Sequence, residues 1–309
     1  MRILITGGAG YIGSILAPAL LARGHQVTVL DTFAQDGFPL AECCRYAGFQ
    51  PVRGDARDTR LLDEMARAHD LFIPLAALVG APLCARDQIG AVTVNRDAVR
   101  DLVSRLSADQ QVVYPTTNSG YGVGEADSFC TEESPLRPVS LYGVTKVEAE
   151  QAVLERGGVT LRLATVFGAA PRMRLDLLVN DFTYRAARDR FVVVFEGHFR
   201  RNYIHIRDVA GAFLHAMDHY DAMRGEPYNV GLSTANLTKL ELCERIRAQV
   251  PDFVVLESDI GKDPDKRDYI VSNDKLEATG WRPEWSLDDG IAELLKAYRM
   301  INVSRFSNV

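Results

Sequence analysis

The sequence has few cysteines and lacks a long hydrophobic run, and both absences exclude classes of protein. Its five cysteines are odd in number and none form a C-x-x-C pair, which argues against a disulfide scaffold or a zinc site. No apolar stretch is long enough to cross a bilayer. The amino-terminal MRILIT runs straight into a glycine-rich loop without the apolar region of a signal peptide. We therefore expect a soluble, cytoplasmic protein without a metal or a membrane partner.

Clustered positive charge is also missing. The 309 residues carry 35 Lys and Arg against 41 Asp and Glu, a net charge of −6, and no basic cluster extends beyond a few residues. This pattern disfavours a nucleic-acid partner. Phosphate-bearing ligands are still compatible with it, because loops and single arginines bind them without a basic surface. The composition, 47% hydrophobic and 25% charged, is that of a globular chain with one large or two smaller domains.

Short apolar strands alternate with helices through the first half of the chain. We predict strands at residues 2–6, 25–31, 49–55, 70–77, 111–117 and 159–168, and helices at about 11–23, 61–68, 95–108 and 142–156. Near-continuous apolar strands between helices indicate a parallel sheet covered on both faces. With right-handed crossovers this is an α/β, doubly wound (Rossmann) fold.

The pattern changes after Gly168. A proline and several charges follow, then a strand at 190–197, a strand running into a helix at 202–218 and a helix at 238–250. We expect a smaller C-terminal α/β domain for the substrate, made of about 169–202 and 233–309. Residues 1–168 with about 203–232 would form the dinucleotide-binding domain.

The loop TGGAGYIG, residues 6–13, lies between the first strand and the first helix. It can be read as G-x-G-x-x-G from Gly8 or as G-x-x-G-x-x-G from Gly7, and both readings share Gly10 and Gly13. Such glycines allow a tight turn and let a pyrophosphate approach the helix N-terminus. Asp31 ends the second strand, where an acid binds the ribose of NAD and repels the extra phosphate of NADP. A glycine-rich turn in another α/β protein is the alternative.

Tyr142 lies four residues before Lys146, at the start of a predicted helix. Residues at this spacing share a face on any helix, so the pair alone is compatible with an ordinary core or surface tyrosine. The loop YPTTNSGYG, residues 114–122, adds a polar cluster at the carboxyl end of a buried strand. Ligands bind at that edge of open α/β sheets.

Together these motifs resemble the extended short-chain dehydrogenase/reductase family, in particular its NAD-dependent nucleotide-sugar epimerase/dehydratase group. The resemblance runs nearly end to end, through TGGAGYIG, GDARD, LAA, TTNSGYG, YGVTK, LRLATVFG, RRNYIHIRDV and GWRPEWSLDDGI. It implies that Tyr142 is the acid/base for a sugar hydroxyl, that Lys146 lowers the tyrosine pKa and holds the nicotinamide ribose, and that Thr117 orients the sugar oxygen. It also implies a homodimer formed through the helices at about 95–108 and 142–156.

The resemblance also implies two sets of binding residues. The NAD-binding set is Gly7, Gly10, Tyr11, Ile12, Gly13, Asp31, Asp55, Ala56, Leu75, Ala76, Ala77 and Asn95, together with Tyr142 and Lys146. The set for a nucleotide-sugar substrate is Asn118, Ser119, Thr165, Arg174, Asn180, Arg201 and Arg267. Arg201 is the expected contact to the diphosphate, and either Lys262 or Arg267 would make a second one. Asp176 lies in the same variable segment, and His205 is expected to be structural.

One departure from the family narrows the chemistry. Asn118 and Ser119 follow Thr117 where the 4,6-dehydratases carry an Asp–Glu pair, so classical dehydration is disfavoured. Cys84 lies in a loop near the expected site, but a free cysteine is most often an inert apolar residue. A 4-epimerase acting through a transient 4-keto sugar is the leading hypothesis. A nucleotide-sugar 4-dehydrogenase or ketoreductase is the alternative, and a non-catalytic NAD-binding sensor is a weaker one.

Overall fold

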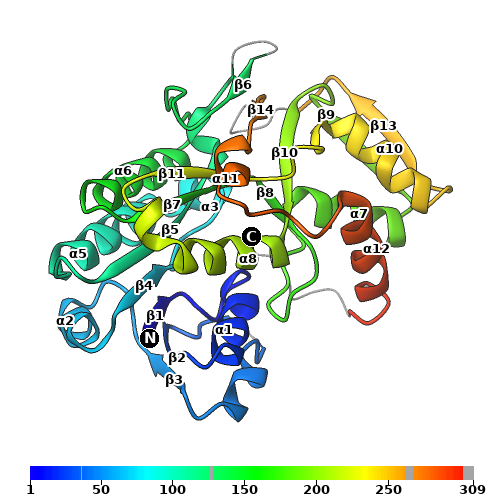
Figure 1. Ribbon diagram of the computed structural model, residues 1–309. Helices are drawn as coiled ribbons and strands as arrows, with labels where there is room; N and C mark the ends of the chain where they lie inside the picture. The colour runs from blue at the N-terminus through cyan, green and yellow to red at the C-terminus, as the bar shows by residue number, and fades with distance from the viewer. Residues whose placement is uncertain (36, 125–127, 262–266, 302–309) are drawn as a thin grey trace.

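A twisted parallel sheet, here called the main sheet, forms the centre of the protein (Figure 1). The computed structural model describes residues 1–35, 37–124, 128–261 and 267–301, and within them the main sheet has seven strands in the order β11-β7-β5-β4-β1-β2-β3. All neighbouring strands are parallel. The strands are β1 (Arg2–Thr6), β2 (Gln26–Asp31), β3 (Phe49–Arg53), β4 (Leu71–Pro74), β5 (Gln111–Thr117), β7 (Val159–Leu163) and β11 (Pro227–Val230). The predicted doubly wound α/β fold is confirmed.

Helices cover both faces of the main sheet because its strands are apolar on both sides. On one face lie α2 (Thr59–Ala68), α5 (Ala98–Arg105) and α6 (Leu141–Glu155); on the other lie α1 (Gly13–Ala22) and α8 (Ile206–Asp218) (Figure 1). In β1, Leu4 packs with the first group, whereas Ile3 and Ile5 pack with the second. Successive side chains of a strand point to opposite faces, so each needs its own helical layer.

A second group of strands and helices gathers beside the main sheet, on the side of its carboxyl ends (Figure 1). A three-stranded sheet has the order β12-β10-β8, and β13 pairs in parallel with β9. The strands are β8 (Thr165–Phe167), β9 (Phe191–Phe195), β10 (Arg200–His205), β12 (Asn236–Thr238) and β13 (Val254–Ser258). Three helices pack together there, α7 (Leu178–Arg188), α10 (Lys239–Gln249) and α12 (Leu287–Ala297).

Shorter elements complete the described chain. The helices are α3 (Ala81–Arg86), α4 (Gln88–Val92), α9 (Tyr220–Met223) and α11 (Asp274–Ala278), with 3₁₀ turns at Ala41–Arg45 and Asn118–Tyr121. Two short strands, β6 (Phe129–Cys130) and β14 (Ile270–Val271), pair in parallel. The helix expected at 95–108 instead begins at Gln88 and contains a π-helical turn, Thr93–Asp97, before α5. Such a turn is often found at functional sites, and this one carries Asn95.

The strand predicted at 159–168 is two strands in different sheets. At Ala164 the backbone N–H still donates to the Val230 carbonyl of β11, at 2.9 Å. One residue later Thr165 pairs with Tyr203 of β10. The apolar pattern continues across the break because both strands are largely buried, which is why the sequence reads as one strand. The break directs the chain out of the main sheet, at the point where the predicted substrate segment begins.

Helix α12 is tied back to the centre of the molecule through Glu293. Its carboxylate accepts the Ala169 N–H at 2.9 Å and lies 2.9 Å from Nε2 of His205. The His205 ring is fully buried and stacks on Trp285. His205 therefore has a structural setting, as the sequence predicted.

Candidate active site

A cavity of about 1280 Å³ opens at the carboxyl ends of the main-sheet strands. It runs from the glycine loop after β1, past the ends of β2, β4 and β5, to β9 and the start of α10. This is the edge where the sequence analysis places both ligands. The cavity brings together most of the predicted site residues, namely Gly7, Gly10, Tyr11, Ile12, Gly13, Asp31, Asp55, Ala56, Leu75, Ala76, Ala77, Thr117, Ser119, Tyr142, Lys146, Thr165, Arg174, Arg201 and Arg267.

The glycine loop is shaped so that its backbone faces this cavity. Gly7 has a φ of +69°, and a Cβ there would lie 2.5 Å from the Cα of Ala76. A Cβ on Gly13 would overlap the Gly8 carbonyl oxygen. A Cβ on Gly10 would meet only the Gly7 carbonyl oxygen within 4 Å, at 3.2 Å. Gly7 and Gly13 are thus needed for the turn and the helix packing, whereas at Gly10 a missing side chain leaves room for a ligand.

The start of α1 suits a pyrophosphate. Its first turn carries no acidic residue, and the N-terminal end of a helix favours a bound anion. Asp31 stands at the end of β2, where its carboxylate accepts the N–H of Ala9 at 2.9 Å and of Phe33 at 2.8 Å. These bonds fix the carboxylate on the cavity wall. The residues present therefore fit a dinucleotide.

Asp55 and Asn95 differ in how they relate to the cavity. Asp55 lines it and forms an ion pair with Arg57 at 2.6 Å, which lowers the pKa of the Asp55 carboxyl. Asn95 does not line it. Its amide instead accepts the Leu78 N–H at 2.7 Å and donates to the Leu78 carbonyl at 2.9 Å. Asn95 thus holds in place the loop that continues from Leu75, Ala76 and Ala77.

Thr117, Tyr142 and Lys146 approach the cavity from two elements, β5 and α6. Thr117 is the last residue of β5, and its Oγ1 accepts the Ser119 N–H at 3.1 Å. Tyr142 lies in the first turn of α6, which Ser140 caps by accepting the Gly143 N–H. Lys146 follows one turn later. All three residues line the same cavity as the glycine loop.

Lys146 is almost completely buried, with 4% of its surface exposed. Its Nζ lies 3.9 Å from the centre of the Tyr114 ring, a cation–π contact. Burial lowers the pKa of Lys146 to about 7, and the negative charge of Glu150 opposes that shift. The protonation of Lys146 therefore responds to small changes in its surroundings near neutral pH.

The far half of the cavity contains the predicted substrate residues. Arg174 is paired with Asp176 at 2.5 Å, and Arg201 is 2% exposed on β10. Ser119, Thr165 and Arg267 also line this half. Lys262, the other candidate for the second phosphate contact, lies outside the described residues.

Asn118 and Asn180 do not line the cavity. Asn180 is fully buried, where it accepts the Gly168 N–H at 3.0 Å and donates to the Arg174 carbonyl at 2.8 Å and to the Tyr11 hydroxyl at 3.2 Å. The Tyr11 hydroxyl in turn donates to the Gly168 carbonyl at 2.6 Å. Asn118 is 1% exposed, and within the described part of the chain neither polar atom of its amide has a partner. Asn180 therefore shapes the segment that carries Arg174.

Sequence reasoning missed two parts of the cavity wall. Arg172 is 4% exposed and donates to Gln35 Oε1 at 2.9 Å, which links the loop after β2 to the substrate segment. Its signal in the sequence was the repeated arginine of PRMR. The second part is the outer face of β9, where Phe191, Val193 and Phe195 are exposed. Both faces of this strand are apolar, so periodicity could not show which one is open.

Cys84 is buried beside the site without lining it. Its thiol donates to the Leu78 carbonyl at 3.2 Å, and the Asn95 amide lies 3.7 Å from the sulfur. This setting agrees with the expected structural role of a small apolar residue.

Comparison with known proteins identifies the chain. A model of the NAD dependent epimerase/dehydratase family matches residues 3–231. The chain belongs to this family. It is an NAD-dependent enzyme of the extended short-chain dehydrogenase/reductase type, so the predicted family and cofactor are confirmed.

Similar proteins span the whole chain. The low-salt glycan biosynthesis protein Agl12 of Haloferax volcanii is 30% identical over 96% of this chain and 98% of its own length. The dTDP-glucose 4,6-dehydratase of Streptomyces niveus is 29% identical, covering 97% of this chain and 93% of its own length. The UDP-glucose 4-epimerase of Thermus thermophilus, solved in complex with NAD, has a TM-score of 0.81 at 26% identity, covering 97% of this chain and 99% of that one.

Two features are absent from the described residues. None of their helices combines the length and the apolar character needed to span a bilayer. In the same part of the chain, no three His, Cys, Asp or Glu side chains gather as a metal site would require.

Proposed function

We propose that this family member is a nucleotide-sugar 4-epimerase that works through a transient 4-keto sugar. The proposal is supported by one observation, that Thr117, Tyr142, Lys146 and the glycine loop all line a single cavity. Asn118 and Ser119 support it further, because neither is the carboxylic acid or carboxylate that water elimination needs. One relative is a 4,6-dehydratase, but these two positions favour epimerisation over dehydration in this chain.

The chain's own residues would move one proton and hold the sugar. Tyr142 takes the proton from the C4 hydroxyl. It returns the proton after the keto sugar has rotated to present its other face. Lys146 would place a positive charge near the Tyr142 hydroxyl, and this charge favours the ionised form of the tyrosine. Thr117 donates a hydrogen bond to the same sugar oxygen and fixes its position. Bound NAD would supply the hydride acceptor and donor for C4.

The binding residues divide along the cavity. We propose that residues 1–168 with about 203–232 hold NAD, and that about 169–202 and 233–309 hold the nucleotide sugar. Arg201 and Arg267 would contact the diphosphate, since guanidinium groups bind phosphate through paired hydrogen bonds. Asn118, Ser119, Thr165, Arg174 and Asn180 would line or shape the sugar pocket.

We further propose a homodimer through the helices at about 95–108 and 142–156. Sedimentation velocity would measure this oligomeric state.

A panel of UDP-, GDP-, dTDP- and CDP-sugars tests the reaction. The purified enzyme is incubated with each sugar while nicotinamide absorbance and the product NMR spectrum are followed together. A 4-epimer without net NADH is the expected result. Stoichiometric NADH with a keto sugar would instead identify a dehydrogenase, and a dehydrated product would overturn the argument from Asn118 and Ser119.

A further inference from the structure

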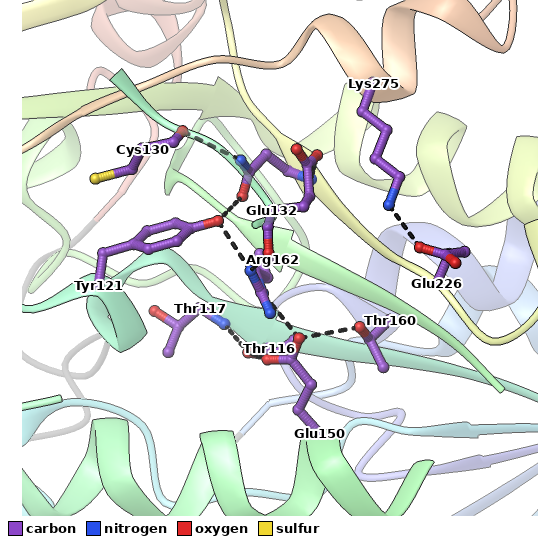
Figure 2. Close-up of polar contacts among 11 residues, drawn as sticks. Thr116, Thr117, Tyr121, Cys130, Glu132, Glu150, Thr160, Arg162, Glu226 and Lys275 are labelled. Carbon is purple, nitrogen blue, oxygen red and sulfur yellow. Dashed lines mark hydrogen bonds and ion pairs between the residues drawn. The ribbon is translucent and has the colours of Figure 1, made fainter. Parts of the chain in front are cut away.

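A buried ion pair lies directly behind the reaction residues. Glu150 of α6 and Arg162 of β7 are 1% and 4% exposed, and Arg162 Nε lies 2.7 Å from Glu150 Oε1 (Figure 2). The pair ties the helix that carries Tyr142 and Lys146 to the main sheet. Neither residue lines the cavity. Burying two charges costs desolvation free energy that a pair of apolar side chains would avoid, so stability alone does not explain the pair.

One side of the pair reaches Thr117. Thr116 Oγ1 donates to Glu150 Oε2 at 3.0 Å and accepts the Thr117 N–H at 2.5 Å (Figure 2). Thr160 Oγ1 donates to Glu150 Oε1 at 3.2 Å. The carboxylate therefore has three donors, and one of them fixes the backbone of the residue proposed to orient the sugar oxygen.

The other side of the pair holds the loop that follows Thr117. Arg162 Nη1 donates to the Tyr121 hydroxyl at 3.1 Å and to the Glu132 carbonyl at 3.0 Å. The Tyr121 hydroxyl donates to Asn229 Oδ1 of β11 at 2.7 Å. Tyr121 ends the short 3₁₀ turn that begins at Asn118. The backbone on both sides of Thr117 is thus held by a single hydrogen-bonded network.

Glu150 also lies one helical turn beyond Lys146. The groups that face Lys146 are Glu150 on the same helix, the Cys84 thiol on α3 and the Tyr114 ring on β5. The first of these is the carboxylate that stabilises the charged form of Lys146 against burial. The Glu150 carboxylate therefore affects both Thr117, through Thr116, and Lys146, through its negative charge.

We propose that the Glu150–Arg162 pair is a positioning element of the active site, which fixes the Thr117 backbone through Thr116 and supplies the negative charge beside Lys146. Glu150 and Arg162 are positioning residues and touch neither ligand. This inference rests on the proposed function for the role of Thr117 and Lys146. It adds Glu150 and Arg162, which would act on the reaction only by positioning other residues.

The first arm of the test separates the Thr116 link from the ion pair. Thr116→Val removes the hydroxyl but keeps Glu150 and Arg162 together, whereas Thr116→Ser keeps the hydroxyl. We expect kcat to fall about tenfold or more in Thr116→Val, with KM and NAD affinity nearly unchanged, and Thr116→Ser to restore it. The matched control is Glu226→Gln, which neutralises the carboxylate of the half-exposed Lys275–Glu226 pair (Figure 2). It is expected to change turnover by less than about twofold.

The second arm needs no substrate. Protein labelled with [ε-¹³C]lysine is titrated by NMR, and a Lys146→Met variant assigns the Lys146 signal. In Glu150→Gln the titration midpoint of Lys146 should move down by about one pH unit, because the nearby negative charge is gone. In Thr116→Val and Glu226→Gln it should stay in place. If Glu150→Gln does not fold, the Thr116 arm still tests the link.

The outcomes distinguish this inference from the proposed function. A folded Glu150→Gln protein with an unmoved Lys146 titration overturns the inference, and so does a Thr116→Val enzyme that matches the parent in kcat. A parent that is inactive on every sugar of the panel overturns the proposed function instead, and the Lys146 titration then decides the inference alone.

Discussion

Lys146 shows how far a single side chain depends on its surroundings. Its ammonium group is almost completely shielded from water in the apoprotein, and it lies over the face of Tyr114. A positive charge here can interact with a bound ligand. In the apoprotein, however, burying this charge lowers the free energy of unfolding.

Lys146→Met should stabilise the apoprotein at pH 7, and this advantage should shrink as the pH rises. The unfolded chain keeps the Lys146 proton up to about pH 10.5, whereas the folded protein releases it near pH 7. Between these values the unfolded state binds more protons, so the unfolding free energy contributed by this group rises with pH. The advantage of the variant should fall by roughly 3 kcal/mol between pH 7 and pH 10.

Urea unfolding at several pH values measures this difference. Lys296→Met, which removes an exposed lysine of α12, is the control and should change little. A Lys146→Met advantage that is independent of pH would mean that Lys146 is not a strained charge in the apoprotein.

Tyr142→Phe should lower kcat by about 10²- to 10⁴-fold, because it removes the proposed acid/base and leaves the ring. NAD affinity, followed by fluorescence quenching, should stay within a few-fold of the parent. Tyr46→Phe removes a hydroxyl that Arg45 contacts outside the cavity, and it should leave kcat unchanged. Equal turnover in Tyr142→Phe and the parent would revive the non-catalytic sensor.

Single residues were predictable where a motif carries their role. Tyr142, Lys146 and Thr117 were predicted from the resemblance to the family, and all three line the cavity. Arg172 was not, because its partner Gln35 lies far away in the sequence and only the fold brings them together. Asn180 was expected at the substrate, yet its hydrogen bonds go to the protein itself, since local spacing does not reveal which way a buried amide points.

At the scale of elements, glycines of the glycine loop serve two different purposes. Gly7→Ala places a Cβ against the Ala76 backbone at a left-handed φ, so it should destabilise the apoprotein by about 2 kcal/mol or more. Gly10→Ala meets only one oxygen and should cost less than about 1 kcal/mol. The NAD affinity of Gly10→Ala should nevertheless fall about tenfold or more, because the new methyl group occupies the pyrophosphate path.

Thermal unfolding and NAD titration of both variants check this contrast. If Gly10→Ala bound NAD as tightly as the parent, the pyrophosphate would not lie against Gly10. If Gly7→Ala were as stable as the parent, the loop would be able to adopt a different backbone conformation at residue 7.

The elements of the main sheet were mostly predictable, because apolar strands alternating with helices have few other solutions. The break between β7 and β8 was not, since Leu163, Ala164 and Phe167 are all buried and the apolar pattern continues across it. The separation depends on two distant partners, Val230 and Tyr203, that no local pattern encodes.

For the whole molecule, ligand binding should be visible as added stability. A ligand that binds only the folded protein raises its unfolding free energy in proportion to the logarithm of its concentration. NAD should therefore raise the melting temperature, and NADP at the same concentration should raise it less, because the Asp31 carboxylate repels the 2′-phosphate. Asp31→Ser should narrow that difference. Equal shifts with the two cofactors in the parent would remove Asp31 as the discriminating residue.

The place of β11 at the edge of the main sheet also has a consequence for protein synthesis. The strand is made from residues 227–230, yet its partner β7 is complete at Leu163. While the ribosome makes the segment between them, β7 remains an open edge whose backbone groups can pair with another chain. Nascent chains that stop before Pro227 should therefore expose this edge to other chains or to chaperones, and the edge should close once the chain has been made as far as Val230.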